Sequence, residues 1–164
     1  MEGFIGMGSN LGNRWANLRS GLDGLRFRGL RIIAASSVWE TEPIDSPEPL
    51  WFLNMALALE TNAHPLDLLD LLLEVERDAG RRRGAANAPR TLDLDLLALG
   101  DLQWRDQRLD LPHPRMWDRR FVLEPLVEIA PWLRNPATGI TVAEQRPRLR
   151  DAARVFRVGR LEAY

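Results

Sequence analysis

Hydrophobic and polar residues recur along this chain with two periods, which predict its helices and strands. Apolar residues three or four positions apart indicate one face of a helix, and alternating ones indicate a strand. The predicted elements are a strand from Phe4 to Met7, a helix with the apolar stripe Trp15, Leu18, Leu22 and Leu25, strands from Arg31 to Trp39 and from Trp51 to Thr61, a helix from Pro65 to Ala79, a strand within Pro89 to Leu97, and a short returning strand from Leu102 to Trp104.

The strand within Pro89 to Leu97 carries two carboxylates on one face. Alternation places Asp93 and Asp95 beside Thr91 and Leu97 on that face, and leaves the opposite face to Leu92, Leu94 and Leu96. Like charges two residues apart repel each other, so a divalent cation with arginine neighbours is the simplest way to offset them. Mg²⁺ suits such a pair, because it takes one or two carboxylates together with waters and phosphate oxygens. The alternative is an ordinary exposed strand face, which the tripeptide alone favours.

The order strand, helix, strand, strand, helix, strand predicts an α+β protein. It matches the ferredoxin-like α/β sandwich, in which helices pack on a mainly antiparallel sheet. A length of 164 residues fits one domain, residues 1–164. If the two helices cover the apolar face, Asp93 and Asp95 share the open face with Phe52 and Asn54, and we expect the functional site there.

Composition excludes several classes of site and partner. The chain has no cysteine, which excludes disulfides, thiolate metal sites and a cysteine nucleophile. All 22 basic residues are arginine, so guanidinium groups must bind any polyphosphate. The net charge of −1 argues against a general nucleic-acid binder, and no apolar run approaches the ~20 residues of a membrane span. We therefore expect a cytoplasmic protein with no nucleic-acid or membrane partner.

Weaker signals come from one glycine-rich segment, the two histidines and the C-terminal tail. The segment from Gly6 to Gly12 resembles a dinucleotide fingerprint, but its glycine spacing is one residue too long, so a strand-to-helix turn is favoured. His64 is interpreted as a helix cap, whereas His113 lies between two prolines and is the better functional candidate. The tail from Arg146 to Arg160 could contact nucleic acid, but its interspersed apolar residues favour a solvated terminal element.

Taken together, these segments resemble the 6-hydroxymethyl-7,8-dihydropterin pyrophosphokinase family. The resemblance rests on Gly8-Ser9-Asn10-Leu11, on Thr41 to Asn54, on Pro89-Arg90-Thr91-Leu92-Asp93-Leu94-Asp95, on Leu111-Pro112-His113-Pro114 and on Arg119 to Pro131. It implies an enzyme of folate biosynthesis that transfers diphosphate from ATP to the hydroxymethyl group of the pterin and releases AMP. The tail after Gly139 is the least similar part.

The resemblance also implies roles for individual residues. Asp93 and Asp95 would hold two Mg²⁺ ions and would act in catalysis with Arg90. The ATP-binding positions would be Arg81, Arg83, Arg90, Leu96, Arg108, His113 and Arg119. The pterin-binding positions would be Thr41, Glu42, Pro43, Ile44, Phe52, Asn54 and Phe121, with the two phenylalanines on either side of the ring. A monomer is expected, and a dimer stays open.

The sequence departs from the family pattern at some positions, and three other functions are compatible with it. Asn87-Ala88 stand where many members have Trp-Gly, and Leu73 stands where some have glutamine. One rival is a ferredoxin-like module that binds nucleotide or RNA, although paired aspartates would repel phosphate without a metal. Another is a different Mg²⁺-dependent phosphotransferase, which would release ADP, and a third is an inactive family member.

Overall fold

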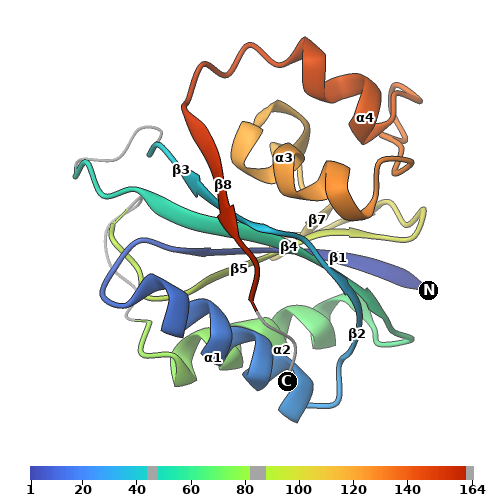
Figure 1. The fold of residues 1–164 in the computed structure, drawn as a ribbon. Coiled ribbons are helices and arrows are strands. Elements are labelled where there is room, and N and C mark those ends of the chain that lie inside the picture. Colours follow the sequence, from blue (N-terminus) through green and yellow to red (C-terminus); the bar gives the residue numbers. More distant parts are fainter. Residues whose placement is uncertain (44–47, 82–87, 162–164) are drawn as a thin grey trace.

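The computed structural model describes residues 1–43, 48–81 and 88–161, which form three layers (Figure 1). Helices α1 (Arg14–Phe27) and α2 (Pro65–Asp78) lie on one side of a central sheet, and α3 (Arg120–Ile129) lies on the other, with the short α4 (Val142–Gln145) beside it. The expected α+β class is confirmed. Among the described residues, no helix is both long enough and apolar enough to cross a membrane.

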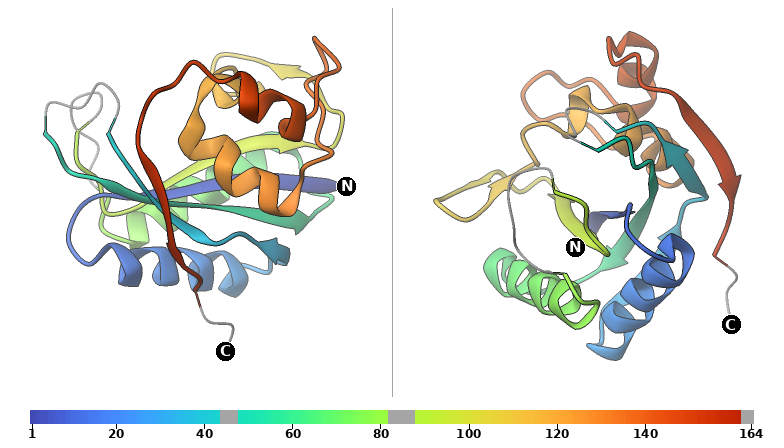
Figure 2. Two further views of the ribbon diagram at one scale, coloured as in Figure 1. Left: turned by 45° about the horizontal axis from the view of Figure 1, so that its top comes forward. Right: turned by 90° about the vertical axis from the view of Figure 1, so that its left-hand side faces the viewer.

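The central sheet has six strands in the order β5-β1-β4-β3-β8, with β2 also paired to β4, and every pairing within it is antiparallel. Figure 2 shows the strands twisting across the molecule between the helical layers. The strand bounds are β1 Glu2–Ser9, β2 Arg31–Ala35, β3 Val38–Thr41, β4 Phe52–Glu60, β5 Asp93–Leu99 and β8 Val155–Gly159; a separate pair is formed by β6 Trp104–Arg105 and β7 Asp110–Leu111.

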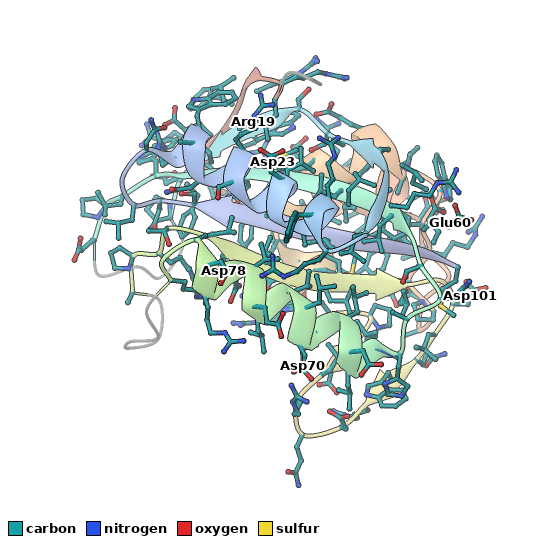
Figure 3. All side chains as sticks on the ribbon, turned by 90° about the horizontal axis from the view of Figure 1, so that it is seen from below. Arg19, Asp23, Glu60, Asp70, Asp78 and Asp101 are labelled. Carbon is teal, nitrogen blue, oxygen red and sulfur yellow. The ribbon has the colours of Figure 1, made fainter. Side chains whose placement is uncertain are left out.

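Helices α1 and α2 form because each has one apolar stripe and a capped start. The side chain of Asn13 accepts a hydrogen bond from an amide in the first turn of α1, and His64 does the same for α2, as predicted. The two stripes pack against the sheet in one core that includes Leu92, Leu94 and Leu96, but Trp15, predicted as part of the α1 stripe, is exposed at the start of the helix. Their opposite faces are polar: the side chains labelled in Figure 3 on these helices, Arg19, Asp23, Asp70 and Asp78, lie on the outer side.

Two predicted strands differ from the structure. The strand expected from Arg31 to Trp39 is divided into β2 and β3 at Ser36 and Ser37, where the Ser36 hydroxyl accepts a hydrogen bond from the Ala56 amide. The prediction of a returning strand from Leu102 to Trp104 is wrong: the strand there is β6, which starts at Trp104 and pairs with β7 through Leu111 in a separate ribbon. Both errors have one cause: partner choice for short strands depends on contacts distant in sequence.

The sheet face expected to be open is partly covered by α3. Its buried residues Val122, Leu123 and Leu126 form a second core with Phe4, Ala56 and other residues of that face. Pro125 lies inside the helix, and its presence disguises the helical pattern in the sequence. The uncovered part of this face, beyond the N-terminus of α3, contains the acidic end of β5.

The C-terminal tail is part of the sheet. Residues Val155–Gly159 form the edge strand β8, with Thr41 of β3 opposite Val155. Figure 1 shows this strand running from the side of α3 towards that of α1 and α2. The expected solvated terminal element is therefore an ordered strand, although several of its side chains are exposed.

Candidate active site

The floor of the candidate site is a row of residues across β4, β1 and β5. Gly8 lies opposite Asn54 on one side and opposite Asp93 on the other, and Gly6 lies opposite Asp95. A Cβ atom at Gly8 would come within 2.6 Å of the Asn54 Oδ1 atom. Glycine is therefore required there, since any larger residue would displace the amide from the floor.

A cavity of about 670 Å³ lies above this floor. Its walls come from the end of β3 and the residues after it, the start of β4, the start of β5, the N-terminal end of α3 and the C-terminal segment. The lining residues are Thr41, Glu42, Pro43, Phe52, Asn54, Arg90, Asp93, Asp95, Arg115, Asp118, Arg119, Phe121, Asp151, Ala152 and Ala153. The cavity thus combines two aromatic rings, an amide, two strand carboxylates and three arginines.

Asp93 and Asp95 face this cavity in different electrostatic surroundings. The Asp93 carboxylate is 2.7 Å from an Arg81 nitrogen and 3.5 Å from an Arg90 nitrogen. Asp95 has no ion pair among the described residues. Burial and the neighbouring charge of Asp93 raise the pKa of Asp95 to about 7, while Arg119 opposes the change. The charged form of Asp95 is therefore poorly compensated by its protein neighbours.

The donor set fits Mg²⁺. Two carboxylates on one strand face leave the remaining positions of an octahedral ion to waters and phosphate oxygens, which is how Mg²⁺ is commonly held. The raised pKa of Asp95 indicates a carboxylate whose charge lacks a partner, and a cation would supply one. Among the described residues, no three His, Cys, Asp or Glu side chains cluster as a metal-binding group, so protein ligands alone would not enclose the ion.

Each of the two phenylalanines in the cavity has an arginine over its ring. The guanidinium carbon of Arg90 is 5.7 Å from the Phe52 ring centroid, and that of Arg119 is 5.4 Å from the Phe121 centroid. Burial and the nearby charge of Arg115 lower the pKa of Arg119. These stacked arginines lie beside the aspartates, where they can meet an anionic group of a ligand.

The amide of Asn54 is fixed by its neighbour. Its Nδ2 donates a 2.6 Å hydrogen bond to the Thr41 hydroxyl, and both residues are buried. This pairing leaves the Asn54 Oδ1 atom directed towards the glycine gap at Gly8. A flat heterocycle between the aromatic rings would meet a polar edge of defined orientation.

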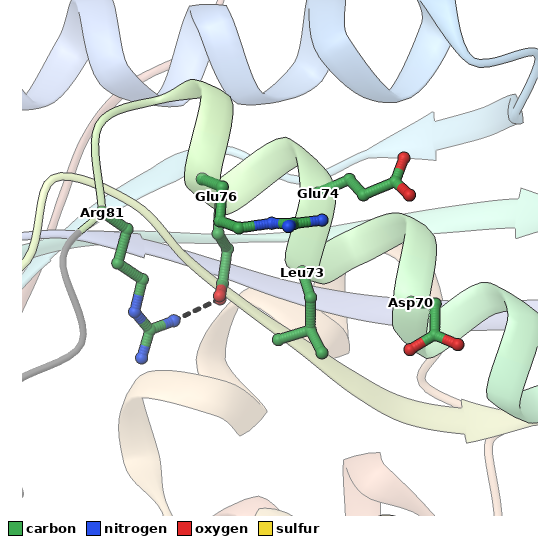
Figure 4. A pocket seen from close by; sticks show the side chains of 6 residues that line it. Asp70, Leu73, Glu74, Glu76 and Arg81 are labelled. Atoms are coloured by element: carbon green, nitrogen blue, oxygen red, sulfur yellow. Dashed lines mark hydrogen bonds and ion pairs between the residues drawn. The ribbon is translucent and has the colours of Figure 1, made fainter.

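A second cavity of about 450 Å³ lies on the α2 side of the Arg81–Asp93 ion pair. Figure 4 shows Arg81 reaching Glu76 from the end of the helix, with Leu73 and Asp70 further along it. The buried Glu76 carboxylate also accepts a 2.7 Å hydrogen bond from the Leu94 amide. Its burial raises the pKa of Glu76, although the hydrogen bond from Leu94 and the charge of Arg81 oppose this. Arg81 thus connects the two cavities.

Of the other predicted ATP-side residues that the structure describes, none lines this second cavity. Arg108 is exposed and forms an ion pair with Asp70, one of the residues lining it. His113 is half-buried, and its amide donates a 2.7 Å hydrogen bond to the Leu97 carbonyl at the end of β5. Burial, with the charges of Arg119 and Arg115, lowers the pKa of His113. Leu96 lies in the core with α1 and α2, as its position in the strand predicts, and outside the lining of both cavities.

Most of the predicted site residues therefore come together. Ten of them line the larger cavity: Thr41, Glu42, Pro43, Phe52, Asn54, Arg90, Asp93, Asp95, Arg119 and Phe121. Ile44 and Arg83 lie outside the described residues. Sequence reasoning missed Arg115, Asp118 and the segment 151–153, of which only Arg115 had a signal, as the neighbour of the proline-flanked His113.

Comparison with known proteins gives one consistent family. Residues 4–131 match the model of the family described as 7,8-dihydro-6-hydroxymethylpterin-pyrophosphokinase. A 2-amino-4-hydroxy-6-hydroxymethyldihydropteridine pyrophosphokinase of Bacillus subtilis is 35% identical over 147 residues, which are 89% of this chain and 88% of that protein. The enzyme of the same name from Pseudomonas aeruginosa is 40% identical over 134 residues, which are 81% of this chain and 83% of that protein.

Solved structures agree on the fold. A crystal structure of Plasmodium falciparum HPPK-DHPS superposes with a TM-score of 0.71 at 13% identity and covers 90% of this chain. The match spans 43% of that longer chain. At this identity the likeness concerns the fold alone.

Proposed function

The chain belongs to the 7,8-dihydro-6-hydroxymethylpterin-pyrophosphokinase family, and on this premise we propose that the cavity around Asp93 and Asp95 is its active site. The enzyme transfers diphosphate from ATP to the hydroxymethyl group of 6-hydroxymethyl-7,8-dihydropterin, a step of folate synthesis. A bond forms between the hydroxymethyl oxygen and the β-phosphorus, the bond from that phosphorus to the α-phosphate breaks so that AMP leaves, and the hydroxyl proton is released to solvent. The observation that carries the proposal is the shared cavity of two carboxylates, two phenylalanines and a fixed amide.

The pterin binds between Phe52 and Phe121. Both rings line the cavity, and the polar edge of the pterin faces Asn54, which Thr41 holds in place. A ligand without matching donors and acceptors would leave this buried amide unpaired, which disfavours it. Glu42 and Pro43 complete the wall from the end of β3, and Ile44 is proposed to extend it.

The phosphates lie beside the carboxylates. Arg90 and Arg119 exchange their contacts with the phenylalanine rings for phosphate oxygens when substrates enter, because a guanidinium group binds phosphate bidentately. Charge that develops on the departing AMP is stabilised by these two guanidinium groups. Positioning and electrostatic stabilisation dominate this kind of reaction.

Asp93 and Asp95 would hold Mg²⁺, and two ions are proposed. The metal would supply positive charge that offsets the charge of the phosphates. Arg81 and Arg90 hold the Asp93 carboxylate in position beside Asp95.

The nucleoside part of ATP occupies the side of β5 nearer α2. The proposed contacts are Arg81, which lines the cavity of Figure 4, Arg108, which pairs with Asp70 of that lining, and also His113 and Arg83. Leu73 lines that cavity and offers an apolar surface to the adenine. The contact of Leu96 with the adenine side stays a prediction.

Finer points of architecture belong to the same proposal. The order β5-β1-β4 with β2 beside β4, and α1 and α2 on one face, supports the ferredoxin-like sandwich. A single domain over residues 1–164 and a monomeric enzyme, with a dimer as the alternative, are consistent with one site built from one chain.

The test is a product assay with purified protein, ATP, Mg²⁺ and 6-hydroxymethyl-7,8-dihydropterin, followed by phosphorus NMR. The expected products are AMP and the pterin diphosphate in equal amounts, and neither should form with EDTA or with Asp95→Ala. The exposed Asp101 gives a matched control, Asp101→Ala, which should retain turnover. ADP with a pterin monophosphate would contradict the proposal, and so would turnover that persists in EDTA.

A further inference from the structure

Residues 151–156, here called the C-terminal strap, join the two walls of the cavity. They lie beyond residue 131, where the match to the family model ends. One end of the strap contacts the start of α3, which carries Phe121, and the other contacts the chain around Phe52. Figure 1 shows the chain passing from the region of α3 and α4 into β8.

At the first end, Asp151 caps α3. Its Oδ2 accepts a 2.9 Å hydrogen bond from the Arg120 amide, the first residue of the helix, and its Oδ1 accepts one from the Ala153 amide. The adjacent N-cap residue, Arg119, provides no side-chain cap of its own. A carboxylate at a helix N-terminus satisfies an unpaired amide and interacts favourably with the helix dipole. Asp151 therefore fixes the helix start, and with it Arg119 and Phe121.

At the second end, Arg154 holds the other wall. Its amide and guanidinium group donate to the Glu42 carboxylate at 3.0 and 3.2 Å, while its carbonyl accepts from the Glu42 amide. Its guanidinium carbon also lies 5.0 Å from the ring centroid of Trp51, and Phe156 stacks on the same ring. The hydrogen bonds from Arg154 lower the pKa of Glu42. Trp51 precedes Phe52, so these contacts position the aromatic residue of the opposite wall.

Between these two ends the strap faces the cavity. Asp151, Ala152 and Ala153 line it directly, and the small alanine side chains leave space beside the aromatic rings. The Arg120 guanidinium group donates to the Ala153 carbonyl at 3.2 Å and so secures the middle of the strap to α3. The strap therefore sets the separation of the two walls at the place where a flat ring would enter.

We propose that Asp151 and Arg154 are positioning residues for the pterin, holding Phe121 and Phe52 at the spacing that accepts one flat bicyclic ring. This inference rests on the proposed function, since it assigns the pterin to this cavity. It predicts an effect confined to the pterin at the Arg154 end, because the strap contacts neither Arg81 nor the second cavity in the described residues. At the Asp151 end the start of α3 also carries Arg119, so a smaller effect on the phosphates is expected there. Neither residue touches the reacting atoms in the proposed arrangement.

The test compares Asp151→Ala and Arg154→Ala with wild type in steady-state kinetics for both substrates. Loss of a helix cap or of a charged hydrogen-bonded pair is expected to raise KM for the pterin about fivefold in both variants, and in Arg154→Ala KM for ATP and kcat should stay within about twofold. Asp151→Asn keeps one acceptor and should recover most of the loss. The controls are Arg150→Ala, an exposed neighbour of the strap, and Asp101→Ala, an exposed turn residue.

A binding measurement tests the effect of the strap on pterin affinity independently of the reaction. Calorimetric titration with 6-hydroxymethylpterin, in the presence of Mg²⁺ and α,β-methylene-ATP, should show the same fivefold weakening in the two strap variants, about the magnitude expected for a lost cap. If the wild-type protein binds the pterin but releases no AMP, the reaction proposal fails while weaker binding by the variants still supports the strap. If the variants match wild type in pterin affinity and KM, the strap proposal is wrong.

A purely structural role has its own signature. It would lower the thermal midpoint and raise both KM values together, with no recovery in Asp151→Asn, and this result would also overturn the proposal. If Asp151→Ala does not fold, Arg154→Ala tests the opposite end of the strap through the same comparison.

Discussion

The two faces of β5 use one strand for opposite purposes. On one face, Leu94 and Leu96 are buried against α1 and α2 in the larger core. On the other, Asp93 and Asp95 face a cavity, and burial together with the charge of Asp93 raises the pKa of Asp95. Because successive side chains of a strand point to opposite faces, stabilising leucines and destabilising aspartates follow one another along the same backbone. The stability gained on the leucine face therefore offsets the cost of holding two like charges together on the other.

The largest effect is expected from removing a charge on the acidic face. Asp95→Asn should lower kcat about a thousandfold or more, because the metal and the phosphates lose a carboxylate in the reacting arrangement. The free energy of unfolding should stay the same or rise, since the substitution removes one of two neighbouring like charges. AMP release and urea denaturation measure the two quantities on the same preparation.

The control for this comparison is Asp101→Asn, which changes an exposed carboxylate outside the cavity. It should leave both turnover and stability near wild type. A large loss of stability in Asp95→Asn would contradict the division of the strand into a functional and a stabilising face.

The leucine face should give the reverse result. Leu94→Ala removes a buried side chain and leaves a cavity in the core, at an expected cost of about 3 kcal/mol in the free energy of unfolding. At a temperature where the variant remains folded, KM for both substrates should change little, because the neighbouring carboxylates stay on the same strand. Denaturation curves and kinetics at that temperature test this, and an activity loss comparable with that of Asp95→Asn would show that the faces are not separable.

The strand faces could be predicted from the sequence because the period of two is local. The same period placed Asn54 and Phe52 on the acidic face, and the structure confirms their proximity to Asp93. The roles implied by the family resemblance could not be derived from this local pattern. The metal-binding and nucleotide-binding assignments remain predictions, although the structure brings most of those residues together.

The missed parts of the site depend on contacts distant in sequence. Asp151 reaches the Arg120 amide across 31 positions, and no local pattern identifies a helix cap from so far away. Helix α3 was not predicted because Pro125 interrupts its pattern, and the strand character of Val155–Gly159 depends on pairing with β3. Where an element depends on a partner distant in sequence, composition and periodicity are not enough to predict it.

Gly8, which lies between Asn54 of β4 and Asp93 of β5, offers a finer test of the acidic face. In Gly8→Ala the added Cβ would meet the Asn54 Oδ1 atom at 2.6 Å, so the amide must move. KM for the pterin should rise about tenfold through loss of a buried hydrogen bond, with a smaller change for ATP. Gly6→Ala is the matched variant, because its Cβ would meet Leu97 at an ordinary 3.6 Å, and a weaker effect is expected. Equal effects of the two substitutions would show that Asn54 is not the residue displaced.

The smallest effect is expected at the edge of the second cavity, where the charges are solvated. Arg108 forms an exposed ion pair with Asp70, and exposed pairs contribute little to stability. Arg108→Ala should therefore leave the thermal midpoint near that of wild type, while KM for ATP rises about threefold, as expected for one solvated phosphate or ribose contact. Asp70→Ala frees the arginine without removing it and should leave KM for ATP unchanged or lower it. If instead both variants raise this KM equally, the ion pair itself, rather than the Arg108 guanidinium group, supports ATP binding, and the contrast between a buried acidic face and a solvated rim would need revision.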